Sequence, residues 1–427
     1  MEIESLHKLF LECSSVSTDT RKIDANSMFV ALKGANFDAN TFAEEALKKG
    51  AKYVIIDNED YYIDSRTILV SDSLVALQEL GKFHRSYLKL PIIGLTGSNG
   101  KTTTKELIQV VLRKKFNVKA TFGNLNNHIG VPLTLLSFSD STEIGIVEMG
   151  ANHQREIAFL SDLAMPDFGY ITNFGKAHLE GFGGVEGVVK GKKELYDHLR
   201  LNRKLAFVNL DDPIQSEQSA DLERYTFGSG RSQYDVNFSD LSADPFVFLN
   251  FEGVIVKSNL LGGYNSNNIM AAIAIGTYFG VSNQDIVDAI ESYSPNNNRS
   301  QLMIKGSNQI ILDAYNANPS SMAAALNVFV SMKGDRKVAI LGDMFELGEE
   351  SASEHAQMIN SVLEARNIQF LFVGNEFSKV QIQADHFNYF PDFGSVETFL
   401  RANPITDSTI LIKGSRGMAL ERVLNII

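Results

Sequence analysis

Short apolar runs alternate with amphipathic stretches along most of the chain, which is the pattern of an α/β protein. Residues 41–49 and 74–87 have the spacing of amphipathic helices. The apolar runs typical of buried strands are residues 27–32, 53–56, 67–70, 92–96, 144–148, 168–172 and 204–209. From residue 92 onward each run precedes or follows a helical stretch, so we predict a mostly parallel sheet with helices on both faces.

The pattern repeats in the last third of the chain, where we predict a second, Rossmann-like doubly wound sheet. Its strand candidates are residues 309–313, 337–341, 370–373 and 409–413, and its helix candidates are residues 320–332, 351–365 and 417–426. A connector at 88–91 that ends in proline and a Ser/Asn-rich stretch at 294–300 are typical of boundaries between domains. We therefore predict three domains, at residues 1–88, 89–296 and 297–427.

The composition is that of a globular protein with an acidic surface. The 427 residues include 39 Lys and Arg against 51 Asp and Glu, a formal net charge of −12. Because affinity for a phosphate backbone needs a basic face, no nucleic-acid partner is expected. Cys13 is the single cysteine, which favours a reducing compartment. The chain starts without a signal-peptide pattern and its longest apolar stretch, 269–281, is too short for a membrane span, so we expect a cytoplasmic protein.

The segment 96–103, TGSNGKTT, carries the strongest chemical signal in the chain. A strand candidate enters it and a helical stretch leaves it, which is the setting of a phosphate-binding loop in a P-loop-type domain. Gly97 and Gly100 let the backbone N–H groups point at phosphate oxygens. Lys101 would contact the outer phosphates, and the Thr102 hydroxyl would bind Mg²⁺. The loop predicts nucleotide binding but no particular reaction, because a kinase, a GTPase and a ligase would all use it.

The form of this loop, with Leu95 where the general pattern has its first glycine, resembles that of the Mur ligase family of peptidoglycan synthesis. Six further stretches carry the resemblance: GNLNNHIGVP at 123–132, EMGANH at 148–153, AHLEGFG at 177–183, DAYNANP at 313–319, LGDMFELG at 341–348 and KGSRG at 413–417. They are spread over all three predicted domains, so the resemblance covers nearly the whole chain. The stretches at 313–319 and 341–348 favour the branch of the family that adds a dipeptide.

The resemblance implies an ATP-dependent ligase that joins D-alanyl-D-alanine to UDP-MurNAc-tripeptide and forms the pentapeptide precursor. The tripeptide carboxylate would attack the γ-phosphate of ATP, and the dipeptide amine would then attack the acyl phosphate. Two Mg²⁺ ions and a lysine carbamylated by CO₂ would assist, and the family is usually monomeric. Two alternatives stay open: a sister Mur-type or folylpolyglutamate-type ligase that adds a single amino acid, and a non-catalytic nucleotide-binding switch.

The resemblance also implies which residues hold ATP and metal. The nucleotide set is Thr96, Gly97, Ser98, Asn99, Gly100, Lys101, Thr102 and Thr103 in the loop, Asn268 at the base, and Arg299 and Asp313 at the ribose or phosphates. Thr102 and Glu148 would hold one Mg²⁺, and His178 and Lys192 the second; Lys101, His178 and Lys192 form the catalytic set. Lys190 and Lys193 remain alternatives for the carbamylated lysine.

The residues themselves support parts of this assignment. Glu148 ends one strand candidate and His178 lies just past another, and open α/β sheets bind their ligands at the carboxyl ends of strands. An ammonium beside a metal would be repelled, whereas a carbamate would bind it. Because only a neutral amine reacts with CO₂, the pKa of the modified lysine must be lowered.

The implied substrate set is spread along the chain. Its members are Asp19, Thr20, Arg21 and Lys33 for the UDP group, Asn126, Asn127 and His128 for the sugar-peptide, and Asn316, Asn318 and Arg416 for the dipeptide end. A surface salt bridge remains the alternative for Arg21, and a structural role at a helix end remains the alternative for Arg416.

Overall fold

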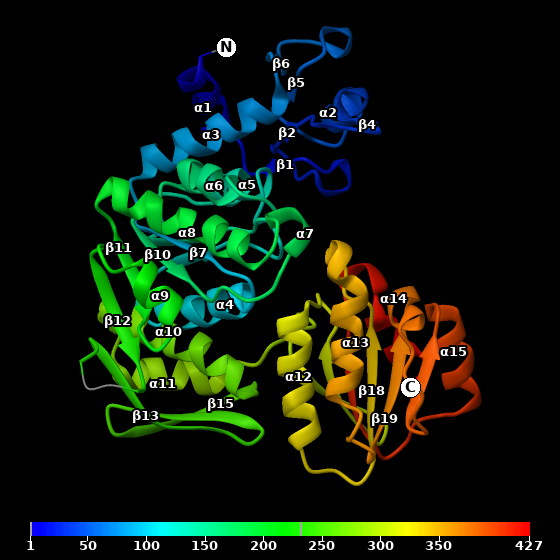
Figure 1. The fold of residues 1–427 in the computed structure, drawn as a ribbon. Coiled ribbons are helices and arrows are strands. Elements are labelled where there is room, and N and C mark those ends of the chain that lie inside the picture. The colour runs from blue at the N-terminus through cyan, green and yellow to red at the C-terminus, as the bar shows by residue number, and fades with distance from the viewer. Residues whose placement is uncertain (1, 231–232) are drawn as a thin grey trace.

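The computed structural model describes residues 2–230 and 233–427, which form three α/β domains that follow one another along the chain (Figure 1). Within these residues, no helix combines the length and the apolar character that a membrane crossing requires. The N-terminal domain lies above the central domain in the view of Figure 1, and the C-terminal domain lies to one side.

The N-terminal domain contains a small parallel sheet in the order β1-β2-β5-β6. Its elements are α1 (Ile3–Leu11), β1 (Val16–Ser17), β2 (Met28–Val30), β3 (Lys33–Gly34), β4 (Phe37–Asp38), α2 (Ala43–Lys48), β5 (Tyr53–Ile56), β6 (Thr67–Leu69) and α3 (Ser73–Leu88). The long helix α3 begins where the carboxylate of Asp72 accepts hydrogen bonds from the backbone N–H groups of Leu74 and Val75. This helix leads directly into the first strand of the central domain.

The central domain contains a nine-stranded sheet in the order β15-β14-β13-β12-β11-β10-β7-β9-β8. Its strands are β7 (Ile92–Thr96), β8 (Val118–Ala120), β9 (Ile144–Glu148), β10 (Phe168–Ile171), β11 (Leu205–Asn209), β12 (Arg224–Gly228), β13 (Val236–Ala243), β14 (Phe246–Phe251) and β15 (Val254–Leu261). Its helices are α4 (Lys101–Leu112), α5 (Gly130–Leu136), α6 (Glu156–Ala164), α7 (Leu179–Phe182), α8 (Val185–Asn202), α9 (Pro213–Gln218), α10 (Ser266–Tyr278) and α11 (Asn283–Ser292).

Helices cover both faces of the central sheet, as predicted. Apolar side chains of α4, α10 and α11 pack in one buried cluster, and those of α6 and α8 pack in another with alternate residues of the same strands. The antiparallel strands β13, β14 and β15 at one edge were absent from the prediction. Polar residues interrupt β13 and β15, which makes a weaker signal than a continuous apolar run, whereas β14 is apolar except at Asn250 and could have been predicted.

The C-terminal domain contains a six-stranded sheet in the order β16-β17-β21-β18-β19-β20, and only β16 pairs antiparallel. Its elements are β16 (Gln301–Lys305), β17 (Asn308–Asp313), α12 (Pro319–Ser331), β18 (Lys337–Gly342), α13 (Ser351–Ser361), β19 (Ile368–Val373), α14 (Asn375–Lys379), β20 (Phe387–Phe390), α15 (Phe393–Ala402) and β21 (Thr409–Lys413). The helix predicted at 417–426 is wrong. Two 3₁₀ turns, Arg416–Met418 and Leu420–Asn425, replace it because Ala419 between them has a left-handed backbone with φ 47°.

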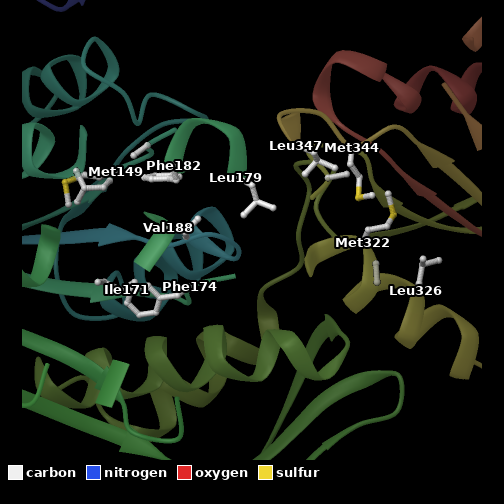
Figure 2. Packing of buried hydrophobic residues seen from close by; sticks show 14 of the residues in the cluster. Met149, Ile171, Phe174, Leu179, Phe182, Val188, Met322, Leu326, Met344 and Leu347 are labelled. Carbon is white, nitrogen blue, oxygen red and sulfur yellow. The ribbon is translucent and has the colours of Figure 1, made fainter. Parts of the chain in front are cut away.

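The central and C-terminal domains meet through apolar side chains. Leu179 of α7 belongs to the same buried cluster as Met322 of α12 and as Met344 and Leu347, which follow β18. Figure 2 shows these residues facing each other across the boundary between the two domains. The carboxyl ends of β7, β9 and β10 lie beside this boundary, so loops of the central sheet and the start of the C-terminal domain can share one site.

Candidate active site

The loop between β7 and α4 depends on its two glycines. Gly97 has φ 140° and Gly100 has φ 80°, conformations that other residues rarely adopt. A Cβ atom at Gly97 would lie 2.0 Å from the hydroxyl oxygen of Thr172, and one at Gly100 would lie 2.6 Å from Oδ1 of Asn268. Side chains are therefore excluded on both sides of the turn. The backbone N–H groups of Ser98 and Asn99 are bonded to Asn173, so an anion would be held by the N–H groups at the start of α4.

Lys101, the first residue of α4, folds back over this loop. Its ammonium donates hydrogen bonds to the carbonyl oxygens of Gly97 at 2.6 Å and Ser98 at 3.1 Å. Burial lowers the pKa of Lys101 to about 8, and the nearby carboxylate of Glu148 opposes that shift. The lysine therefore lies at the position where the charge of a bound phosphate would be neutralised.

A buried carboxylate faces the same turn. Glu148, the last residue of β9, is 1% exposed and accepts a hydrogen bond from the Thr102 hydroxyl at 3.0 Å. The Asn126 amide donates to it at 2.9 Å, and the Lys105 ammonium lies 3.5 Å away. Carboxylate and hydroxyl oxygens are ligands that Mg²⁺ prefers. The described residues contain no cluster of three or more His, Cys, Asp or Glu side chains, so these groups fit Mg²⁺ only if phosphate oxygens and water complete its shell.

His178 lies at the start of α7 and lines the same cavity as Lys101 and Glu148. Its backbone is left-handed, with φ 52°, and its Nδ1 atom contacts the carboxylate of Glu346 from the C-terminal domain. A carboxylate on one ring nitrogen sets the orientation of the ring, so the other nitrogen is available as a ligand.

Lys192 is the buried member of the three lysines in α8. It is fully shielded, donates to the carbonyl oxygen of Ala151 at 3.2 Å and lies 4.8 Å from the centre of the Phe182 ring. Burial, followed by the positive charge of Lys101, lowers its pKa well below the ordinary value. Lys190 is exposed, and the ammonium of Lys193 pairs with Asp197 at 2.6 Å.

A cavity of about 700 Å³ joins these groups to the predicted nucleotide residues. Its lining includes Ser98, Asn99, Gly100, Lys101, Thr102, Thr103, Asn126, Asn127, His128, Glu148, His178, Asn268, Arg299, Asp313, Asn316 and Asn318. Thr96 lies beneath the loop instead, because its buried hydroxyl donates to the carbonyl oxygen of Met149 at 2.8 Å. Its place in the nucleotide set is therefore indirect, and Lys192 likewise lies behind the cavity wall.

Asn268 belongs to a buried amide network. It accepts a hydrogen bond from the Thr104 hydroxyl at 3.0 Å and donates to Asn265 at 2.8 Å. Asn265, which sequence reasoning missed, is the residue that precedes α10, and it lines the cavity. The network positions both amides at the edge of the phosphate loop. The short stretch of polar residues at 265–268 is the sequence signal that could have identified Asn265.

Arg299 and Asp313, at the start of the C-terminal domain, contact residues that the sequence analysis did not assign to the site. The Arg299 guanidinium lies 3.5 Å from the centre of the Tyr315 ring. Asp313 accepts a bond from the buried Lys413 ammonium at 2.6 Å and from the backbone N–H of Ser300 at 3.1 Å. Tyr315 and Lys413 both lie in motifs noted in the sequence, which was the signal that could have identified them.

The remaining predicted residues lie outside this cavity. Arg21 is an exposed surface residue paired with Asp19 at 2.8 Å, and Thr20 lies in the same turn. Lys33 pairs with Asp57 at 2.8 Å in the N-terminal domain. The Arg416 guanidinium pairs with Glu421 at 2.9 Å and lies 5.8 Å from the centre of the Tyr315 ring. The structure does not bring these residues together with the phosphate loop.

Comparisons with known proteins match this arrangement over the whole length. Residues 12–85 match the Mur ligase family catalytic domain, residues 95–276 the Mur ligase middle domain, and residues 298–416 the Mur ligase glutamate ligase domain. A relative from Bacillus subtilis, named UDP-N-acetylmuramoyl-tripeptide–D-alanyl-D-alanine ligase, is 35% identical, with 96% of this chain and 92% of the relative covered. The chain belongs to the Mur ligase family.

Solved structures of Mur ligases agree with the fold. MurF from Acinetobacter baumannii superimposes with a TM-score of 0.86 at 31% identity, covering 99% of this chain and 97% of that one. MurF from Thermotoga maritima, solved in complex with ADP, superimposes with a TM-score of 0.83 at 27% identity, covering 98% and 97%. The three-domain α/β architecture predicted from the sequence is thereby confirmed, as is the resemblance to Mur ligases.

Proposed function

We propose that this chain is an ATP-dependent ligase that forms the C–N bond between D-alanyl-D-alanine and UDP-MurNAc-tripeptide. The observation that carries the proposal is that the phosphate loop and Glu148 line the same cavity as Arg299 and Asp313. The names of the relatives support the same reaction, and the complex of the Thermotoga maritima MurF with ADP supports the use of ATP. The stretch 313–319 lines this cavity through Asn316 and Asn318, which supports a dipeptide as the incoming amine.

The first step joins two anions, so the main task of the protein is to position them and to neutralise charge. The oxygen of the tripeptide carboxylate would bond to the γ-phosphorus of ATP while the bond to ADP breaks. Lys101 and the loop N–H groups would hold the phosphates as negative charge shifts toward ADP. Thr102 and Glu148 would hold one Mg²⁺ and His178 the other, and the metal would supply further charge neutralisation.

In the second step, the dipeptide amine would attack the acyl carbon, lose a proton and expel inorganic phosphate. Asn126, Asn127 and His128 line the central-domain side of the cavity and would contact the sugar-peptide. Arg416 would contact the dipeptide carboxylate after releasing Glu421. In the N-terminal domain, Asp19, Thr20, Arg21 and Lys33 would bind the UDP group, and this assignment rests on the family resemblance.

Lys192 would carry a carbamate. The supporting observations are its complete burial and the lowered pKa of its amine, because a neutral amine is the form that reacts with CO₂. The carbamate would convert this amine, whose positive form is disfavoured by burial and by Lys101, into an anion. The negative charge would favour a divalent cation there.

The decisive experiment measures phosphate release from ATP and Mg²⁺ in the presence of UDP-MurNAc-tripeptide and D-alanyl-D-alanine. We expect release to require both substrates and the pentapeptide product to be visible by mass spectrometry. D-alanine, L-lysine, diaminopimelate or glutamate in place of the dipeptide tests for a sister ligase that adds a single residue. ATP cleavage that is independent of every amine would instead indicate a nucleotide-binding switch.

Size-exclusion chromatography of the same sample tests the expected monomer.

A further inference from the structure

The segment between β10 and α7 is bonded to the phosphate loop. The backbone N–H groups of Ser98 and Asn99 donate to Asn173, through its carbonyl oxygen at 3.0 Å and its side-chain oxygen at 3.1 Å. The Thr172 hydroxyl donates to the carbonyl oxygen of Asn99 at 2.6 Å. A displacement of this segment would therefore move the loop that is proposed to hold ATP.

The continuation of the same segment is bonded to the C-terminal domain. The backbone N–H of Lys176 donates to the Ser320 hydroxyl at 2.9 Å, and its ammonium pairs with the Glu354 carboxylate at 2.6 Å. Two residues later, His178 contacts Glu346. Three consecutive contacts thus connect this short segment with α12, α13 and the loop after β18.

The Lys176–Glu354 pair differs from an ordinary surface salt bridge. The Glu354 side chain is 5% exposed, whereas exposed ion pairs usually contribute little because water competes for both charges. Within the part of the chain that the structure describes, Lys176 is the cation that forms an ion pair with Glu354. The Lys176 side chain is 43% exposed, so the shielded member of the pair is Glu354. Without Lys176 its carboxylate would lack a compensating charge in the docked arrangement, so the ion pair favours docking.

A second bridge connects the C-terminal domain with the phosphate loop directly. The Asn318 amide donates to the side-chain oxygen of Asn99 at 2.7 Å. Asn318 also begins α12, where its side-chain oxygen accepts from the backbone N–H of Ser321 at 2.9 Å. The position of α12 is therefore transmitted to the phosphate loop by Asn318 and to the following segment by Ser320.

We propose that Lys176 and Glu354 are positioning residues that hold the C-terminal domain against the ATP site during the reaction. The inference rests on the proposed ligase function and adds a requirement: ATP is cleaved efficiently only while this ion pair is formed. Docking would shield the acyl phosphate from water and bring the amine to it. Because neither side chain contacts a reacting atom in this scheme, both act through the arrangement of the domains.

The test uses charge reversal within the full-length protein. The variants are Lys176→Glu, Glu354→Lys and the double exchange, with Glu354→Gln added because that site is nearly buried. The matched control is Lys379→Glu, since Lys379 pairs with Glu376 at 2.5 Å within the C-terminal domain and its side chain is 64% exposed. Small-angle X-ray scattering with ADP reports the distance between domains, thermal unfolding reports folding, and steady-state assays separate kcat from KM.

We expect each single reversal to lower kcat by about tenfold and to increase the radius of gyration with ADP, while a cooperative thermal transition shows that the variant is still folded. The double exchange should restore both quantities, and the control should match the wild type. Unchanged scattering and kcat in both single variants, or a double exchange that restores neither, would overturn the proposal. If the wild type lacks dipeptide-dependent phosphate release, the ligase function fails, whereas the scattering measurement still decides whether this pair holds the domains together.

Discussion

The hydroxyl of Thr102 and the carboxylate of Glu148 are hydrogen-bonded at 3.0 Å, although 46 positions separate them in the chain. Thr102 lies in the first turn of α4, and Glu148 ends β9, the parallel neighbour of β7. Because parallel neighbours end at the same edge of a sheet, the loop after one strand meets the last residue of the next. The proposed metal site follows from this geometry.

Replacement of Lys101 by alanine should abolish most of the ligase activity. The ammonium lies over the phosphate loop, and loss of a preorganised charge-stabilising donor typically lowers kcat by about a hundredfold or more. Phosphate release with all substrates present measures the effect. Lys114→Ala, an exposed lysine just after α4, is the control that should retain activity. Undiminished synthesis in the Lys101 variant would refute the proposed role.

Glu148→Gln should weaken the use of Mg²⁺ while the fold is retained. The amide keeps the size of the side chain and can still accept from Thr102, but it lacks the negative charge that attracts the cation. We expect the Mg²⁺ concentration for half-maximal activity to rise by about tenfold or more. A titration of activity with MgCl₂, together with an unfolding curve, measures this. An unchanged Mg²⁺ requirement would exclude Glu148 as a ligand.

Lys192→Ala should be inactive, and small carboxylic acids should restore part of its activity. The acid would replace the carbamate in the space left by the side chain. In the wild type, removal of dissolved CO₂ should lower activity, and added bicarbonate should restore it. Because its pKa is lowered, the Lys192 amine becomes neutral at a lower pH than the amine of an ordinary lysine does. Carbamylation should therefore persist near neutral pH. Lys190→Ala, an exposed neighbour, is the control; full activity of the Lys192 variant without added acid would rule out the carbamate.

The buried pair of His7 and His84 should make the N-terminal domain sensitive to acid. The two rings are hydrogen-bonded at 3.0 Å, and burial, with a further contribution from His84, lowers the pKa of His7 to about 4. The unfolded chain takes up a proton near the ordinary pKa of about 6.5, so stability is full above that pH. Below it, stability should fall toward pH 4 by at most about 1.4 kcal/mol per pH unit for this group.

His7→Gln tests this prediction, because glutamine can donate to His84 but does not titrate. Urea unfolding measured from pH 7.5 to 4.5 should show a shallower dependence on pH for the variant than for the wild type. His153→Gln, at an exposed histidine, should leave the wild-type slope unchanged. Equal slopes in all three proteins would show that His7 is not responsible.

The elements that were predicted correctly are those with strong local patterns. The strands 53–56, 92–96 and 144–148 coincide with β5, β7 and β9, because parallel strands buried on both faces are continuous apolar runs. The error at 417–426 had a backbone cause. The sequence is compatible with a helix, but Ala419 adopts the left-handed conformation that ends one short turn and begins another.

The three lysines of α8 differ in burial in a way that the local pattern indicates but that the sequence prediction did not use. Val188, Lys192 and Leu195 are spaced by four and three residues and are all buried, so they share the core-facing side of the helix. Lys190 falls on another face and is exposed. Helical periodicity could therefore have favoured Lys192 without reference to a family.

The order of residues along the chain determined the phosphate loop, the strands that carry it and the carboxylate at the end of β9, because each depends on neighbours only a few positions away. Tertiary structure alone decided that Lys176 meets Glu354 and that Asp313 meets Lys413. Those contacts depend on how one folded domain docks on another and on which strands become neighbours. Contacts between residues so far apart produce no periodic pattern of apolar and polar residues by which the sequence could reveal them.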